Sequence, residues 1–157
     1  MTTDRLQIYC DGSCPKPYQV GGWAFIILDT EYIVRSGSYE VATNQTMELC
    51  AALEALREIA RLKYRQRPIT IISDSQYLVK GMMQWGKVWR SKDYQGISNT
   101  EWWKLLHRHQ DHCADLEFRW VKGHGSSKMN NHVDQLAGEA QKRGAAELAR
   151  SQYAENS

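Results

Sequence analysis

The order of apolar patterns along the chain leaves few possible folds. Apolar and polar residues alternate from Arg5 to Asp11, which is the period of a strand with one buried face. Gly21 to Leu28 and Glu31 to Glu40 predict two further strands, joined by a tight turn at residues 29–30. The first third of the chain is therefore expected to form a three-stranded antiparallel meander.

Helical and strand-like segments alternate after this meander. A helix capped by Asn44 is expected to run to about Leu62, with Glu48 in its first turn. Pro68 prevents its continuation, and the apolar run Ile69 to Ser73 is typical of a buried central strand. The later expected elements are a helix over about 75–85, a loop containing Gly86 and Gly96, a helix over about 100–112, a strand over 115–121 and a closing helix. This order favours an α/β domain with a mixed sheet and helices on its faces.

The closing helix sets the limit of the predicted domain. Val133, Leu136, Ala137 and Ala140 form its apolar stripe, whereas the residues after Gly144 are polar and are expected to fray. A chain of 157 residues can bury one ordinary core. We therefore expect a single domain over residues 1–144 and a polar tail over residues 145–157.

Composition excludes several classes of protein. Hydrophobic residues make up 42% of the chain and charged residues 24%, which is close to globular averages. No segment approaches the roughly 18 apolar residues of a membrane span, and no secretion signal is visible, so we expect a soluble, cytoplasmic protein. A net charge of +2 is too small to indicate nucleic acid by itself. The four cysteines lack the paired spacing of a zinc site and are expected to be reduced thiols.

Four acidic residues from distant parts of the chain stand in short motifs. Asp11 opens DGSC, Glu48 lies in TMEL, Asp74 lies in SDSQY, and Asp134 comes ten positions after the histidine of KGH. Asp11 and Asp74 are expected at the carboxyl ends of strands, where active sites gather in such sheets. Carboxylates suit hard cations such as Mg²⁺ or Mn²⁺, and two such ions about 4 Å apart can promote phosphoryl displacement. Any one of these acids alone reads as a cap or a surface charge, but the four together predict a metal site.

These motifs, in this order and spacing, resemble the type 1 ribonuclease H family from about Leu6 to Ala140. The resemblance rests on DGSC, MEL, DSQY, and WVKGH followed by Asn130 and Asp134. It implies a ribonuclease H-like α/β fold whose five-stranded mixed sheet has three antiparallel strands and then two parallel ones. It also implies a metal-dependent endoribonuclease that cuts the RNA strand of RNA/DNA hybrids and leaves 5′-phosphate and 3′-hydroxyl ends.

The same resemblance assigns roles to individual residues. Asp11, Glu48, Asp74 and Asp134 match the catalytic carboxylates, which would hold two Mg²⁺ or Mn²⁺ ions when substrate is bound. His124, between two glycines, matches a mobile histidine that assists proton transfer or product release. The other histidines, at positions 107, 109, 112 and 132, lack such a context and are expected at the surface.

The resemblance also implies a set of substrate contacts. Recognition of RNA requires polar groups at its 2′-hydroxyls. The positions that match such contacts are Asn44, Gln45, Ser75, Gln76 and the backbone near Cys14, and Asn130 matches a further substrate-binding position. Thr43 and Asn99 match positions that hold a DNA phosphate, and Trp85 and Trp103 match aromatics that line the DNA channel. Ordinary capping and turn chemistry is the alternative for the polar residues of this set. For Trp102, Trp120 and Phe118, packing in the core is at least as good an interpretation.

Two segments depart from the family pattern. Many bacterial relatives carry a Gly-Asn-Pro-Gly turn after the first motif, whereas this chain reads Pro15, Lys16, Pro17 and Tyr18. The asparagine that would contact RNA is absent, and Lys16 offers a charge contact to phosphate in its place. Between Trp89 and Asn99 the only cations are Arg90 and Lys92, so fewer phosphate contacts and a shallower salt dependence are expected.

Three other functions stay open at this point. The chain could be a nuclease of the same fold that acts on branched DNA, although the set of 2′-hydroxyl contacts argues against it. It could bind hybrids without cleaving them, although no acidic ligand is lost. It could also work only within a larger replication or reverse-transcription assembly, which a chain that starts at Met1 makes a weaker expectation. We expect a monomer whose partner is an RNA/DNA hybrid and not a membrane.

Overall fold

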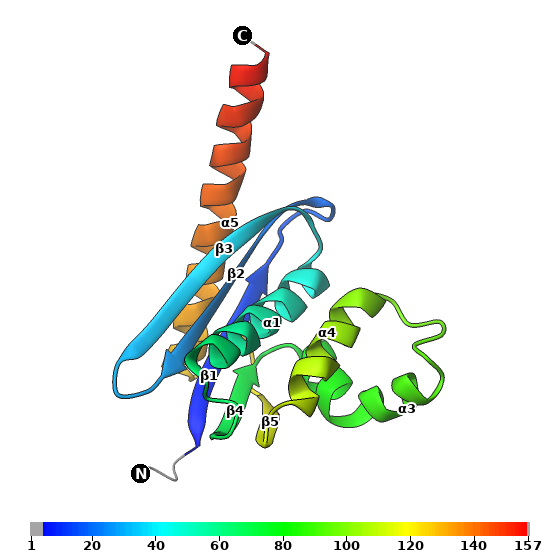
Figure 1. Ribbon diagram of the computed structural model, residues 1–157. Coiled ribbons are helices and arrows are strands. Elements are labelled where there is room, and N and C mark those ends of the chain that lie inside the picture. The colour runs from blue at the N-terminus through cyan, green and yellow to red at the C-terminus, as the bar shows by residue number, and fades with distance from the viewer. Residues whose placement is uncertain (1–4, 157) are drawn as a thin grey trace.

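A five-stranded mixed sheet forms the centre of the computed structural model, which describes residues 5–156 (Figure 1). The strand order is β3-β2-β1-β4-β5. The bounds are β1 Leu6–Ser13, β2 Gln19–Leu28, β3 Tyr32–Ala42, β4 Pro68–Ser73 and β5 Asp115–Trp120. The first three strands pair antiparallel, and β1, β4 and β5 run parallel. The predicted mixed sheet, with its antiparallel meander, is therefore confirmed.

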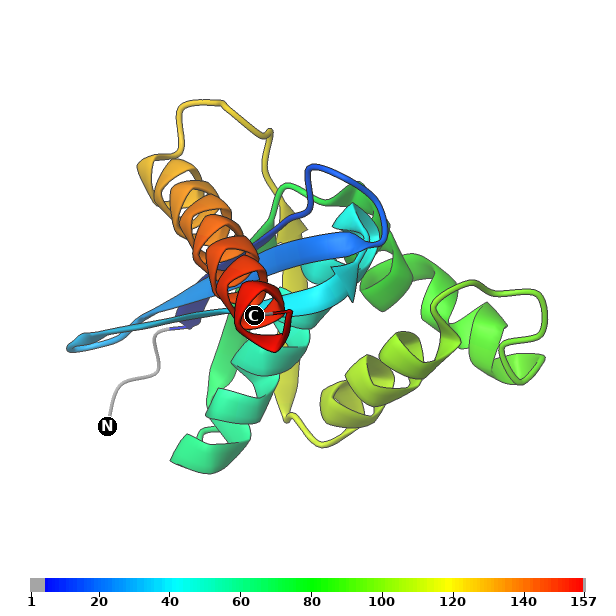
Figure 2. The same cartoon turned by 90° about the horizontal axis from the view of Figure 1, so that it is seen from above.

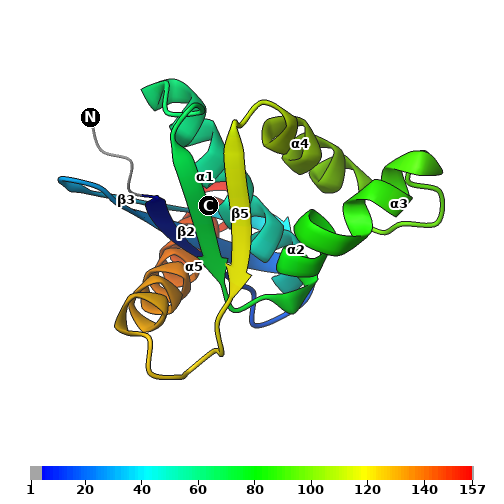
Figure 3. The same cartoon turned by 90° about the horizontal axis from the view of Figure 1, so that it is seen from below.

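Helices cover both faces of the sheet. Figure 2 shows α1 (Asn44–Leu62) on one face and α5 (Lys128–Glu155) crossing the other. The view from below shows α4 (Thr100–Asp111) beside α1, and α5 on the far side of β4 and β5 from them (Figure 3). The main core lies between β1, β2 and β4 and these two helices, α1 and α4, and includes Ile8, Leu53 and Ile71. A smaller cluster with Val133 and Ala137 joins α5 to the sheet.

The start of α1 differs by one residue from the prediction. Thr43, not Asn44, is the N-cap: its side chain accepts a hydrogen bond from the Thr46 amide, and the Thr43 amide donates to the Thr46 hydroxyl oxygen. This reciprocal pair satisfies two donors that a helix start leaves unpaired. Glu48 therefore lies just beyond the first turn of α1 and not within it. The predicted end of the helix at Leu62 is confirmed.

The segment after β4 is helical over a longer range than predicted. It comprises α2 (Gln76–Lys80), a π-helical turn (Gly81–Trp85) and α3 (Gly86–Ser91). Gly86 was expected in a loop, but it is buried within this helix. A Cβ at Gly81 would overlap the ring of Trp103, and one at Gly86 would lie 2.6 Å from Nε2 of His107. These two glycines therefore allow close packing against α4, and neither breaks the helix.

His107 is buried, so its predicted place at the surface is wrong. Its side chain lies beside Trp103, with 1% of the residue exposed. The Tyr94 hydroxyl lies 2.7 Å from Nδ1, and the Gly81 carbonyl oxygen lies 3.0 Å from Nε2. Burial lowers the pKa of His107, which favours the neutral ring. The other three histidines follow the prediction more closely, since His109 is half-buried and His112 and His132 are exposed.

The closing helix also continues beyond the prediction. Residues after Gly144 were expected to fray, but α5 runs without a break to Glu155. Leu136, placed in the apolar stripe, is only partly buried, and Asn130 and Gly144 are buried on that face. The predicted limits at residues 1 and 157 lie outside the described residues. Within residues 5–156, no helix is both long and apolar enough to cross a membrane.

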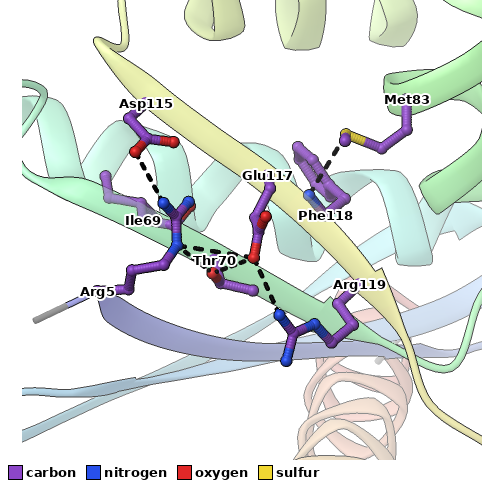
Figure 4. Close-up of polar contacts among 8 residues, drawn as sticks. All are labelled: Arg5, Ile69, Thr70, Met83, Asp115, Glu117, Phe118 and Arg119. Carbon is purple, nitrogen blue, oxygen red and sulfur yellow. Dashed lines mark hydrogen bonds and ion pairs between the residues drawn. The ribbon is translucent and has the colours of Figure 1, made fainter.

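The face of β4 and β5 opposite α1 carries a network of polar contacts (Figure 4). Arg5 pairs with Asp115 at 2.7 Å and donates to the Thr70 hydroxyl at 2.9 Å. That hydroxyl in turn donates to Glu117, which also pairs with Arg119. The strand Ile69–Ser73 is thus apolar toward α1 and carries a satisfied polar group on its other face. On the free edge of β5, the Phe118 amide donates to the Met83 sulfur at 3.4 Å.

Candidate active site

Asp11 is the most buried of the four predicted carboxylates. It lies near the end of β1, opposite Ala24 of β2, and 4% of the residue is exposed. The Gly12 amide donates to its Oδ1 at 2.9 Å, whereas Oδ2 is buried without a hydrogen-bond donor among the described residues. Burial raises the pKa of Asp11 to about 9, and the charges of Asp74 and Asp134 add to the effect. The site therefore strongly disfavours the ionised form of Asp11 unless a positive charge compensates it.

Asp134 lies close enough to Asp11 for the two carboxyl groups to interact. It lies in α5, and the proximity of its carboxyl group contributes to the raised pKa of Asp11. Two carboxylates without a proton have no donor between them, which is why Oδ2 of Asp11 has no partner when both are ionised. The pair therefore holds either a shared proton or a cation.

Close packing at Gly12 brings Glu48 to the same end of the sheet. A Cβ at this position would overlap the backbone of Met47, so only glycine allows β1 to lie this near the start of α1. Glu48 accepts a hydrogen bond at each oxygen, from Asn44 Nδ2 at 2.9 Å and from Ser75 Oγ at 2.6 Å. Burial raises the pKa of Glu48, the Ser75 hydrogen bond opposes this, and the charge of Asp74 adds to it.

Asp74 follows β4 directly and lies near enough to Asp11 and Glu48 to raise the pKa of both. Its backbone carbonyl accepts a hydrogen bond from Trp120 Nε1 at 3.0 Å, which ties the end of β4 to the end of β5. Its side chain approaches the loop after β5 so closely that a Cβ at Gly123 would lie 2.9 Å from Oδ2. The charge of Asp74 raises the pKa of Asp11 and that of Glu48, so Asp74 interacts with both of these acids.

The donor set fits a hard divalent cation, although the side chains do not already enclose one. Within residues 5–156, no three His, Cys, Asp or Glu side chains form a complete ligand group. Mg²⁺ does not need such a cage, because it keeps several waters and takes one or two carboxylates together with substrate phosphates. The buried, unpartnered Oδ2 of Asp11 is the atom that a cation would compensate.

Comparison with known proteins supports the same interpretation. The family model RNase H matches residues 3–142. Ribonuclease H of Pelobacter propionicus is 39% identical over 146 residues, which cover 88% of this chain and 86% of that protein. This chain belongs to the RNase H family. The family generally depends on divalent metal ions.

Two solved structures of RNase H proteins share the fold. LC9-RNase H1, described as a type 1 RNase H with the type 2 active-site motif, superposes with a TM-score of 0.77 at 25% identity. The match covers 90% of this chain and 74% of that one. LC11-RNase H1 in complex with an RNA/DNA hybrid gives a TM-score of 0.70 at 17% identity, over 89% of this chain and 99% of that one. At 17% identity, the similarity to LC11-RNase H1 shows a shared fold alone.

His124 lies in the loop that leads from β5 to α5, beside the RNase H carboxylates. Its φ of 53° is left-handed, its side chain is exposed, and no hydrogen bond or ion pair of that side chain occurs within the described residues. The neighbouring Gly123 contacts Asp74, so the loop is anchored to the site at this glycine.

The predicted RNA contacts gather around the start of α1 and the start of α2. Gln45 and Gln76 are exposed, whereas the Thr43 hydroxyl is engaged in the N-terminal cap of α1. Cys14 is buried, with its thiol 3.4 Å from the Ala42 carbonyl oxygen, which places this backbone beside the end of β3. Asn130 is 0% exposed, and neither polar atom of its side chain has a partner among the described residues.

Trp103, one of the two aromatic residues predicted to line the DNA channel, is buried in the core instead. Trp103 is 0% exposed and donates from Nε1 to the Tyr77 hydroxyl at 3.0 Å, so its ring cannot reach a deoxyribose. Trp85 lies at the surface with Lys80 above its ring, as expected for a contact residue. Asn99 is half-buried and donates to the same Tyr77 hydroxyl at 3.1 Å. Tyr77 therefore links the predicted phosphate contact to the core.

Sequence reasoning missed the two donors to Glu48. The Asn44–Glu48 contact spans four residues of one helix, a spacing that was visible in the sequence. Ser75 is 27 residues from Glu48, and no local pattern signals this contact.

All four thiols are free; three are buried and Cys113 is half-buried.

Proposed function

We propose that this chain is an endoribonuclease that hydrolyses the RNA strand of RNA/DNA hybrids, with two divalent ions, and leaves 5′-phosphate and 3′-hydroxyl ends. The observation that carries the proposal is the Asp11 carboxylate. It is buried, lacks a partner at Oδ2, and is surrounded by the charges of Asp74 and Asp134. A site with this charge arrangement is stable in its ionised form only when cations are present.

The carboxylates are assigned as metal ligands. Asp11 and Asp134 would hold one side of the site, Glu48 the other, and Asp74 would lie between them. Bound Mg²⁺, or Mn²⁺ in its place, supplies an activated water and stabilises the charge of the leaving oxygen. The chain itself contributes the fixed position of the acids at the ends of β1 and β4 and at the start of two helices, α1 and α5.

His124 is assigned to proton transfer or to the release of product. Its exposed imidazole has no hydrogen-bond or ion-pair partner within residues 5–156. A ring on a loop anchored at Gly123 can approach the substrate phosphate during turnover and then withdraw. This role makes His124 an auxiliary group beside the carboxylates.

The hybrid is proposed to lie across the starts of α1 and α2. The RNA strand would meet the backbone near Cys14 and the side chains of Asn44, Gln45 and Gln76. The predicted contact from Asn130 is not carried over, because that residue is 0% exposed. The DNA strand would meet Thr43, Asn99 and Trp85. A single domain over residues 1–144, a monomeric state and a cytoplasmic location complete the proposal. These last three points rest on the sequence alone.

The test is cleavage of a labelled RNA strand in an RNA/DNA hybrid, with duplex RNA, duplex DNA and a four-way DNA junction as comparisons. Each reaction is run in Mg²⁺, in Mn²⁺ and in EDTA, and the product ends are identified by mass. Cutting of the hybrid alone, dependent on metal, is expected. Cutting of the junction would favour the branched-DNA nuclease, and hybrid binding without any cutting would favour the silent binding module.

A matched pair of variants on α5 connects the activity with the site. Asp134→Asn should remove cleavage, because the amide carries no charge to hold a cation. Glu139→Gln is the control, since this exposed side chain lies on the same helix and, within residues 5–156, accepts a hydrogen bond from Gln135 alone. Equal activities of the two variants would contradict the assignment of Asp134.

A further inference from the structure

The hydroxyl group of Ser75 makes two hydrogen bonds within the protein itself. As N-cap of α2, its Oγ accepts a hydrogen bond from the Leu78 amide at 3.1 Å. The same Oγ donates to Oε2 of Glu48 at 2.6 Å. A serine hydroxyl has a single proton, so no donor remains for a ribose. The residue is also only 6% exposed, which leaves little surface for direct contact with a nucleic acid.

Asn44 holds the other oxygen of the same carboxylate. Its Nδ2 donates to Oε1 of Glu48 at 2.9 Å across one turn of α1. Glu48 is thus held by two neutral donors from different parts of the chain, one on α1 and one at the junction of β4 and α2. Each carboxylate oxygen keeps a second lone pair free for another partner.

The charge of Asp74 explains why Glu48 needs to be held. Asp74 repels the Glu48 carboxylate, and a glutamate side chain with free rotamers would turn away from a like charge. Two hydrogen bonds to the ionised form oppose this movement. Neither donor is charged, so the carboxylate keeps its full negative charge, which an Arg or Lys partner would neutralise.

We propose that Ser75 and Asn44 are positioning residues that keep the Glu48 carboxylate turned toward Asp74, and that Ser75 acts on the reaction through Glu48 and not by binding RNA. The inference rests on the proposed metal-dependent hydrolysis and deepens it. It replaces the substrate contact that the family resemblance assigned to Ser75. Asn44 is exposed, so it keeps its carbonyl oxygen and one amide proton for the hybrid.

The first test compares Ser75→Ala with Ser75→Thr, which retains the hydroxyl. Loss of a group that orients a metal ligand typically reduces metal affinity or activity by about 10- to 100-fold. Ser75→Ala should therefore raise the Mg²⁺ dissociation constant, measured by calorimetry without substrate, and lower kcat, each by about 10-fold or more. Affinity for the hybrid in EDTA should not change. Ser75→Thr should restore metal affinity and kcat.

A double-mutant cycle separates the contact with Glu48 from the loss of the α2 cap. In a Glu48→Gln background, Ser75→Ala should cause no further loss of Mg²⁺ affinity, because the group through which Ser75 acts has already been changed. If the cap alone were responsible, the loss would be the same in both backgrounds. Thermal unfolding of all four proteins establishes that each is folded under the conditions of the calorimetry.

Two results would overturn the inference. One is a Ser75→Ala protein whose hybrid affinity falls in EDTA while its Mg²⁺ affinity and kcat stay at wild-type values, since this would show a direct contact with substrate. The other is an equal effect of Ser75→Ala with and without Glu48. Failure of the proposed function is recognised separately, because wild-type protein would then not cleave the hybrid, whereas the Mg²⁺ calorimetry does not depend on cleavage.

Discussion

In metal-free protein, Asp11 should make the fold less stable as pH rises. Burial, together with Asp74 and Asp134, raises the pKa of Asp11 from 3.8 to about 9. Between these values the folded protein holds a proton that the unfolded chain has released. For a group whose folded pKa is raised, the stability is fully present below the unfolded pKa and is lost as pH increases through the folded pKa.

The size of the effect follows from the number of protons. One proton per molecule changes the free energy of unfolding by about 1.4 kcal/mol per pH unit. From about pH 7 to about pH 8.5, Asp11 should therefore remove about 2 kcal/mol of stability. This window excludes the contribution of buried His107, whose lowered pKa gives the opposite trend only below the unfolded value of 6.5.

Urea unfolding in EDTA, followed by circular dichroism, measures this loss in wild-type protein and in Asp11→Asn. The variant cannot ionise, so its advantage over wild type should grow by about 2 kcal/mol across the window. Added Mg²⁺ should stabilise wild type and reduce that difference. Asp29→Asn is the control. The hydrogen bond with Arg67 lowers the pKa of Asp29, so the contribution of Asp29 to folding stability is lost only under acidic conditions. Parallel pH curves for wild type and Asp11→Asn would refute the reasoning.

Three further outcomes are expected. Asp74→Asn should abolish cleavage with hybrid affinity retained in a fluorescence-anisotropy titration, and wild-type rates would contradict the site. His124→Ala should lower kcat by about 10²-fold or less, the range of general acid–base catalysis, and a complete loss would contradict an auxiliary role. Gly81→Ala should cost about 2 kcal/mol in urea unfolding, because overlap with the Trp103 ring outweighs the gain of about 1 kcal/mol in helix propensity. Gly138→Ala, with open space at its Cβ, should not destabilise the protein, and equal losses for both glycine variants would disprove the packing argument.

The sheet was predictable because its signals are local. Alternation in residues 5–11 and the apolar run Ile69–Ser73 each specify a strand without reference to the rest of the chain. Their parallel pairing fits the chain order, since β3 runs in the same direction as β1 and a single helix, α1, connects β3 to β4. The polar face of β4 at Thr70 was not predictable. It depends on Arg5 and Glu117, which lie 65 and 47 residues away.

Burial on α4 could not be read from the sequence. Trp102 and Trp103 are adjacent, and their identity does not tell which ring faces the core. The choice is made by the helical segment after β4, where Gly81 leaves space for the Trp103 ring and accepts from His107 one turn further along. The predictions of an accessible Trp103 and an exposed His107 are therefore wrong for the same reason, which is the close packing of both side chains against Gly81.

In the site, motifs located the acids but not what holds them. Each acid stands beside a recognisable neighbour, so its place at a strand end or near a helix start follows from sequence. The environment that sets its chemistry comes from distant segments. Asp11 is affected by Asp74 and Asp134, which lie 63 and 123 positions further along the chain, and Glu48 is oriented by Ser75.

The turn that departs from the family pattern is attached to the end of β3. The Tyr18 amide donates to the Ala42 carbonyl at 2.6 Å, and the Cys14 thiol lies 3.2 Å from the Lys16 carbonyl oxygen. Exposed Lys16 is therefore held beside the end of β3, directly before the start of α1. Asp11 lies three residues before Cys14 within the sheet, and its pKa reflects none of the residues of this turn. We therefore expect the change from asparagine to lysine to alter the contact with phosphate beside α1, and so to change hybrid affinity and its salt dependence without changing the carboxylate chemistry.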